Sequence, residues 1–137
     1  MTIPSPYFKN ITGVGSLTVE YIIFEANYPA LFTCRDSLGE LYLCLCYDSR
    51  QEQQWIISKT TSQLVIDMLC DKISLYDSLV SPYNKNYIVK WSYASQQENV
   101  LEIEFENIDK LDLPTQGEFI EAETGEFGEY INQLRLK

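Results

Sequence analysis

The segment Leu41–Tyr47 constrains the fold of this chain more than any other part of its sequence. All seven of its residues are leucine, cysteine or tyrosine. This longest apolar run of the chain is far shorter than the roughly 18 residues that a membrane-spanning helix needs. It is also apolar on both faces of an extended strand, as in a central strand that other layers cover on both sides. We therefore expect a layered protein without a membrane span.

Five other segments are dense in β-branched and aromatic residues, which favour strands. These segments are Leu17–Glu25, Ala30–Cys34, Trp55–Ser58, Tyr87–Tyr93 and Val100–Glu106. Turn-forming stretches separate them, among them the hairpin-like loop Asp36–Gly39. The last two segments alternate between apolar and polar residues, and they predict an antiparallel hairpin.

The hydrophobic period becomes helical over Leu64–Leu69, where Thr61 or Ser62 can cap a helix that ends near residues 71–72. A short helical turn is expected over Leu75–Leu79, and a final helix over Phe127–Leu136. The expected fold class is therefore α+β. We predict a mostly antiparallel twisted sheet of about six strands, with one main helix on a face and a short C-terminal helix, in a single domain that spans residues 1–137.

The four cysteines, at positions 34, 44, 46 and 70, have apolar neighbours in segments that are expected to be strand or helix. Free cysteine behaves as a small hydrophobic residue, so we expect reduced thiols in a core. A zinc site is the alternative, because Cys44 and Cys46 share one face of a strand. The chain has no histidine, and neither Cys34 nor Cys70 has a paired ligand nearby in the sequence, so no metal is expected.

The sequence shows no recognisable catalytic machinery. The absence of histidine removes the commonest general base, and with it the Ser-His and Cys-His pairs. Gly13 and Gly15 precede a strand rather than a helix, so they do not form a phosphate-binding loop. Two carboxylates can perform acid–base chemistry, but among 20 acidic residues such pairs arise by chance. We expect no enzyme, no catalytic residue and no cofactor.

The net charge of −10 is concentrated in residues 98–130, which hold eleven acidic residues against Lys110 alone. Acidic and apolar residues alternate from Leu101 to Glu106, which places carboxylates together on one face of a strand. The simpler interpretation is a solvated outer face or a protected sheet edge. The functional interpretation is an acidic ridge that docks on a Lys- and Arg-rich protein. The partner-binding residues predicted on this basis are Glu102, Glu104, Glu106, Asp109, Asp112, Glu118, Glu121 and Glu123.

Tryptophan and tyrosine offer a second candidate surface, because they are favoured anchors of interfaces. They are also favoured in cores and in cross-strand pairs. We expect Trp55 and Trp91, both on predicted strands, to be mostly buried in the sheet.

These patterns predict a non-enzymatic protein-binding domain. It would be an acidic inhibitor, an immunity-type protein or an anti-defence protein that docks on a basic, nucleic-acid-handling protein. Direct binding to nucleic acid needs the opposite charge and is disfavoured. Two alternatives stay open: a structural or oligomeric module (a homodimer included) that uses its sheet edge and aromatic residues, and an enzyme of unfamiliar type that uses carboxylates. Met1–Tyr7 lacks the features of a secretory signal, so a cytoplasmic location is expected.

Several short motifs occur along the chain: Pro29–Cys34, Leu41–Cys46, Asp48–Arg50, Gln54–Ile56, Asp71–Ile73, Asp112–Pro114 and Gly117–Phe119. Together they resemble a family of uncharacterised small cytoplasmic proteins of Gram-positive bacteria and their phages. The resemblance covers nearly the whole chain. It implies a bacterial or phage-borne domain without an assigned activity, and it transfers no functional residue.

Overall fold

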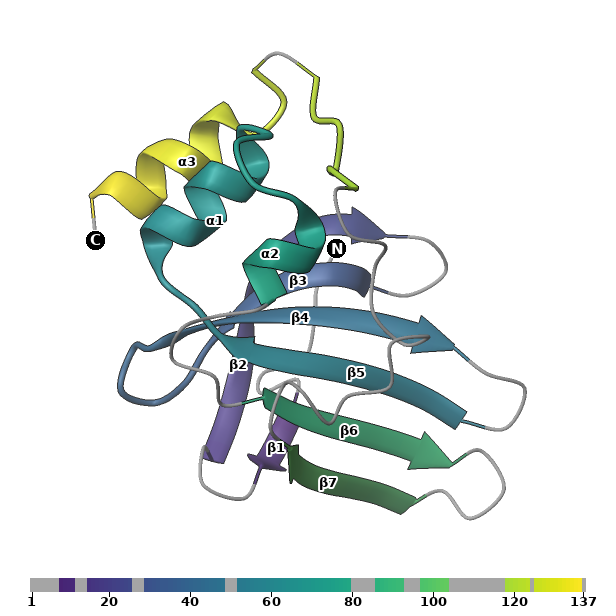
Figure 1. Ribbon diagram of the computed structural model, residues 1–137. Coiled ribbons are helices and arrows are strands. Elements are labelled where there is room, and N and C mark those ends of the chain that lie inside the picture. Colours follow the sequence, from purple (N-terminus) through teal and green to yellow (C-terminus); the bar gives the residue numbers. More distant parts are fainter. Residues whose placement is uncertain are drawn as a thin grey trace.

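The computed structural model describes residues 8–11, 15–25, 29–48, 52–79, 86–92, 97–103, 118–123 and 125–136. The strands are β1 (Phe8–Ile11), β2 (Gly15–Glu25), β3 (Pro29–Arg35), β4 (Leu41–Asp48), β5 (Glu52–Lys59), β6 (Asn86–Ser92) and β7 (Gln97–Ile103). The helices are α1 (Ser62–Leu69), α2 (Leu75–Leu79) and α3 (Gly128–Arg135). In the described residues the seven strands form one sheet, in which each strand pairs with its neighbours in the sequence (Figure 1).

Every strand pair is antiparallel. Short connections join the strands of five of these pairs, whereas residues 60–85, which include α1 and α2, connect β5 to β6. The pairing of β2 with β3 shifts register at three places between Val19 and Glu25. Such irregularities bend a strand and increase its twist. In Figure 1, β2 accordingly crosses behind the sheet at a steep angle to β4 and β5.

The sheet has a hydrophobic core on each face, because side chains alternate along β4. Cys44 and Cys46 join a buried cluster on one face, which also contains Leu17 of β2 and Val89 of β6. Leu41 and Leu43 point to the opposite face and join a cluster with α1, α2 and α3. Figure 1 shows α1 and α3 side by side on this face, with α2 next to them. The prediction that Leu41–Tyr47 is covered on both faces is therefore confirmed for residues 41–44 and 46, whereas Leu45 is only partly buried.

Local signals explain the helix ends. Thr61 caps α1, since its hydroxyl accepts a hydrogen bond from the Leu64 amide at 3.2 Å. The Ser74 hydroxyl accepts a bond from the Asp77 amide at 3.1 Å and caps α2 in the same way. α3 buries Tyr130 and Leu134 on one face, at helical spacing. The expected positions of all three helices are confirmed.

The structure confirms an α+β fold with an antiparallel sheet, and it corrects two details of the prediction. The described part of the chain has seven strands rather than about six, because β1 pairs with β2 although it contains the polar residues Lys9 and Asn10. No single main helix dominates, since α1 and α3 have eight residues each. The predicted last hairpin is antiparallel, but β7 begins at Gln97 rather than at Val100, and Gln97 pairs with Ser92 of β6.

Trp55 is buried, as predicted, whereas the side chain of Trp91 is not among those that the structure describes. The described helices include none that combines the length and the apolar character needed to cross a membrane.

Candidate functional site

Tyr130 fixes α3 to the sheet through a network of polar contacts. Its hydroxyl donates a hydrogen bond to Glu20 Oε2 at 2.6 Å and lies 2.6 Å from Thr33 Oγ1. Glu20 also forms an ion pair with Arg35, with 2.6 Å between Oε1 and Nε. The Tyr130 ring stacks on Tyr21 with 4.2 Å between the ring centroids. Burial, and then the bond to Glu20, raise the pKa of the Tyr130 phenol well above its usual range.

The carboxylate of Asp71 holds the acidic segment 118–123 in place. Its two oxygens accept hydrogen bonds from the backbone amides of Glu121, at 3.1 Å, and Ala122, at 3.0 Å. The Leu75 amide donates a further bond to the Glu118 carbonyl at 2.9 Å. Asp71 adopts a left-handed backbone conformation, with φ of 59°. The segment is therefore tied to the C-terminal end of α1 and to the start of α2.

A pocket of about 430 Å³ lies beside this segment. Residues from β2, β3, β4, α2 and the segment before α3 form its wall. They are Ile23, Phe24, Ala30, Leu31, Leu45, Cys46, Leu75, Glu118, Phe119, Ile120, Glu126 and Phe127. Two aromatic residues of the wall are accessible to solvent: Phe24 is 61% exposed and Phe119 is 39% exposed. We call this feature the apolar pocket.

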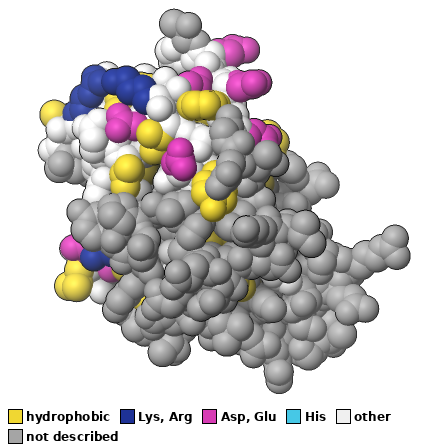
Figure 2. All heavy atoms as spheres, in the orientation of Figure 1, with side chains coloured by type: hydrophobic (Ala, Val, Ile, Leu, Met, Phe, Trp, Pro, Cys, Tyr) yellow, Lys and Arg dark blue, Asp and Glu magenta, His cyan; other side chains and the backbone are white. Residues whose placement is uncertain are grey.

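Four exposed glutamates lie at or near the apolar pocket. Glu118 and Glu126 belong to its wall, and Glu121 and Glu123 lie between them in the sequence. None of them forms an ion pair with a lysine or arginine of the described residues. In Figure 2, acidic and hydrophobic side chains lie next to one another on the upper part of the face shown. We call these four residues the acidic rim. The site thus combines apolar surface with negative charge that no ion pair within the described ranges neutralises.

The structure brings together only part of the predicted ridge. Glu118, Glu121 and Glu123 are exposed and belong to one segment. Glu102 pairs with Tyr87 between β7 and β6, but its side chain lies outside the description. The other four predicted residues, Glu104, Glu106, Asp109 and Asp112, lie outside the described residues.

The sequence analysis missed Glu126 and the apolar residues of the pocket. Glu126 accepts a hydrogen bond from the Glu123 amide at 3.0 Å, which closes the segment before α3. The sequence did contain one indication of the pocket: Phe119 and Phe127 are aromatic residues within a stretch rich in glutamate. Phe24 gave no such signal, because it belongs to a long apolar strand.

Three of the four cysteines are buried, as predicted, and one is not. Cys34 and Cys44 lie on adjacent strands with 3.7 Å between their sulfur atoms, and Cys46 is buried nearby. Burial, and then the contact with Cys34, raise the pKa of the Cys44 thiol. Cys70 is exposed, which corrects the prediction of four core thiols, because it ends α1 and turns away from the core. No group of three metal-ligating side chains occurs among the described residues.

The fold and the site define an α+β protein with an apolar pocket beside an acidic rim. The chain belongs to a family of unknown function, DUF6575, whose model matches residues 7–136. No curated protein and no solved structure matches the chain.

Proposed function

We propose that this protein is a non-enzymatic binding domain that docks on a basic protein through the acidic rim. The observation that carries the proposal is the exposure of the four carboxylates of the acidic rim, none of which a described cation neutralises. Such a surface attracts Lys- and Arg-rich partners, speeds their association and rejects acidic competitors.

The partner that fits this charge is a protein that handles nucleic acid. Proteins of that kind carry basic surfaces, because they must bind phosphate groups. The protein would then act as an acidic inhibitor, or as an immunity-type or anti-defence protein, that covers such a surface. The resemblance noted in the sequence supports an origin in Gram-positive bacteria or their phages, and a cytoplasmic location belongs to the same proposal.

The segment itself offers a surface that keeps its shape. Asp71 and Leu75 hold the backbone of residues 118–122 by three hydrogen bonds. A partner would therefore meet carboxylates on a fixed backbone, which lowers the entropy lost on binding. This contrasts with an acidic tail, which must be ordered by its partner.

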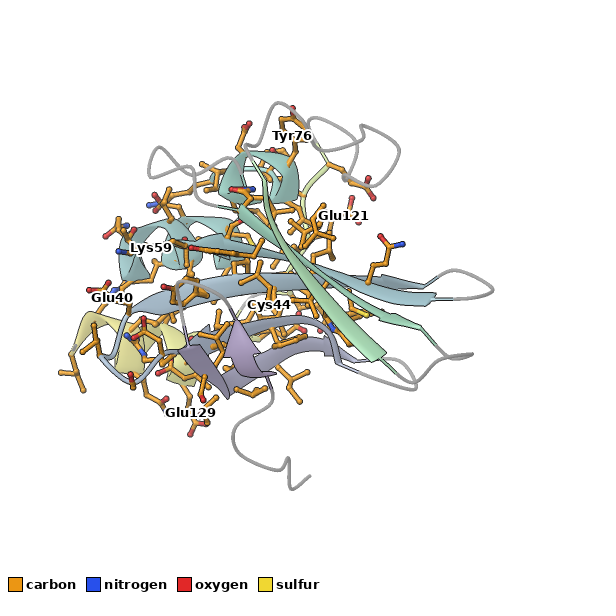
Figure 3. All side chains as sticks on the ribbon, turned by 90° about the horizontal axis from the view of Figure 1, so that it is seen from below. Glu40, Cys44, Lys59, Tyr76, Glu121 and Glu129 are labelled. Atoms are coloured by element: carbon orange, nitrogen blue, oxygen red, sulfur yellow. The ribbon has the colours of Figure 1, made fainter. Side chains whose placement is uncertain are left out.

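Two double variants of equal charge test the proposal. The first, Glu121→Gln with Glu123→Gln, removes two charges from the acidic rim. The second, Glu40→Gln with Glu129→Gln, removes two exposed charges elsewhere. Figure 3 shows Glu40 and Glu129 far from Glu121, and Glu40 lies near Lys59, with which it forms an ion pair of 3.8 Å. Any difference between the variants then reports the position of the charges rather than their number.

The measurement is the association rate with a partner captured at low salt and then purified, at two salt concentrations. We expect the rim variant to associate more slowly, with a flatter salt dependence, and the control variant to resemble the wild type. Exposed charges act mainly on the association rate, so the dissociation rate should change little. Equal association rates for the two variants would refute the role of the rim.

A further inference from the structure

The apolar pocket is open to solvent although nonpolar residues form most of its wall. Pockets that hold a ligand in proteins commonly have volumes of roughly 300–1,000 Å³ and mostly apolar walls. The value of about 430 Å³ lies in the lower part of that range and suits one bulky side chain. Phe24 and Phe119 remain accessible at this site, so an occupant that covers them would remove apolar surface from water.

The charge at the pocket restricts what can occupy it. Glu118 and Glu126 belong to its wall, and Glu121 and Glu123 follow in the same segment. No lysine or arginine of the described residues belongs to the wall. An anionic ligand, such as a fatty acid, would meet repulsion here, whereas a cation beside an apolar group would be attracted.

We propose that the apolar pocket receives one bulky apolar side chain, of phenylalanine or leucine size, from a basic segment of the partner. Lysine or arginine residues on either side of this anchor contact Glu118 and Glu126. The inference rests on the proposed function and adds to it the chemistry that the partner must present. Buried aromatic or aliphatic anchors within a polar surround carry most of the energy in many protein interfaces.

A second copy of this chain is the competing occupant. Leu136 is 87% exposed and stands between Arg135 and Lys137 in the sequence, so it has the required pattern. The net charge of −10 opposes such self-association at low salt. We therefore favour the foreign basic segment, and the oligomeric state decides between the two occupants.

Two short blocked peptides, Lys-Lys-Phe-Lys-Lys and Lys-Lys-Ser-Lys-Lys, serve as probes for the full-length protein. Titration followed by NMR should show tighter binding of the phenylalanine peptide, by about tenfold or more. The protein amide signals that shift on binding of this peptide should include those of Leu31 and Ile120, which belong to the pocket wall. The serine peptide should bind weakly and affect chiefly Glu121 and Glu123.

The outcomes separate this inference from the proposed function. Equal binding of both peptides at the acidic rim would refute the anchor pocket and leave the proposed function intact. Absence of binding by either peptide would refute both. Self-association that Leu136→Ser abolishes would show that a second copy fills the pocket, and it would overturn the inference.

A pocket-filling variant adds a further check. Ala30 belongs to the pocket wall, so Ala30→Leu should reduce the affinity for the phenylalanine peptide to that for the serine peptide. Leu38→Ala is the matched control, since Leu38 is 87% exposed in the loop between β3 and β4 and is absent from the pocket wall. If Ala30→Leu does not fold by NMR, Phe119→Ser takes its place. An unchanged preference for phenylalanine in the folded variant would overturn the inference.

Discussion

At the scale of single residues, Tyr130 joins α3 to two strands at once. Its hydroxyl contacts Glu20 of β2 and Thr33 of β3, while its ring stacks on Tyr21. The side chain is 1% exposed, so water cannot replace these contacts. The phenol proton is committed to Glu20, which leaves Thr33 as the donor to the phenol oxygen. The position of α3, and of Phe127 just before it, depends on this side chain.

We predict that Tyr130→Phe lowers the free energy of unfolding by about 1–3 kcal/mol, because Glu20 and Thr33 lose a buried partner. Denaturation in urea measures the change. Tyr21→Phe is the matched control, since it alters the neighbouring ring of the stack and removes a hydroxyl for which the described residues show no hydrogen bond. Equal losses for the two variants would contradict the role assigned to the Tyr130 hydroxyl.

The same variant should change the alkaline limit of stability. In the unfolded chain a tyrosine ionises near its ordinary pKa of about 10. The raised pKa of Tyr130 means that the folded state keeps this proton to higher pH. The stability contributed by Tyr130 is therefore complete below pH ~10 and is lost as the pH rises above it. The wild type should lose more stability than Tyr130→Phe over this range, since Tyr42 and Cys44, whose pKa values are also raised, are common to both proteins.

At the scale of elements, local signals were sufficient to predict the helices. Thr61 and Ser74 cap their helices within three residues, so a short window of sequence contains the whole signal. β1 could not be predicted in this way. It has four residues, two of them polar, and it is a strand because β2 supplies its hydrogen-bond partners.

The candidate site was only partly predictable for a related reason. The abundance of glutamate identified Glu118, Glu121 and Glu123, but charge alone does not reveal a pocket. Asp71 was interpreted only as the end of a helix. Its carboxylate binds backbone amides 50 and 51 positions further along the chain, and no periodic pattern encodes a contact of that separation.

Asp71 gives the prediction at this scale. Asp71→Gly removes both acceptors without straining the backbone, whose φ of 59° glycine tolerates. We expect faster hydrogen exchange at the amides of Glu121 and Ala122, with a loss of unfolding free energy of about 1–3 kcal/mol. Asp71→Asn should lie between this variant and the wild type, because asparagine keeps one acceptor.

Asp67→Asn is the control for Asp71. Asp67 lies on α1, four residues before Asp71. In the described part of the chain its carboxylate accepts a hydrogen bond from the exposed side chain of Gln63 and forms no hydrogen bond with the segment 118–123. It should leave the exchange of both amides unchanged. If Asp71→Gly also leaves it unchanged, the segment is held by other contacts and our account of its fixed backbone fails.

At the scale of the whole molecule, the sheet separates two cores. The sequence of Leu41–Cys46 within β4 indicates that both faces are covered, because both faces carry leucine, cysteine or tyrosine. It does not show which face meets the helices, since Leu43 and Cys44 suit both environments. The side that the helices cover is set by contacts between distant segments, such as those of Leu31 and Leu43 with α1 and α3, which no local pattern contains.

Three cysteines are buried in the sheet and one is exposed, so the rate at which a thiol reagent modifies the buried ones can report how often the sheet opens. A thiol reagent should modify Cys70 at once in the native protein, whereas Cys34, Cys44 and Cys46 become available only when the sheet opens. We predict one modified thiol per folded chain by mass spectrometry, and none at once in Cys70→Ser. More than one fast thiol would show that the core face formed by β3 and β4 is accessible. The ratio between the slow rate and that of a free thiol gives the free energy of opening, so the stability of this core can be followed without a denaturant.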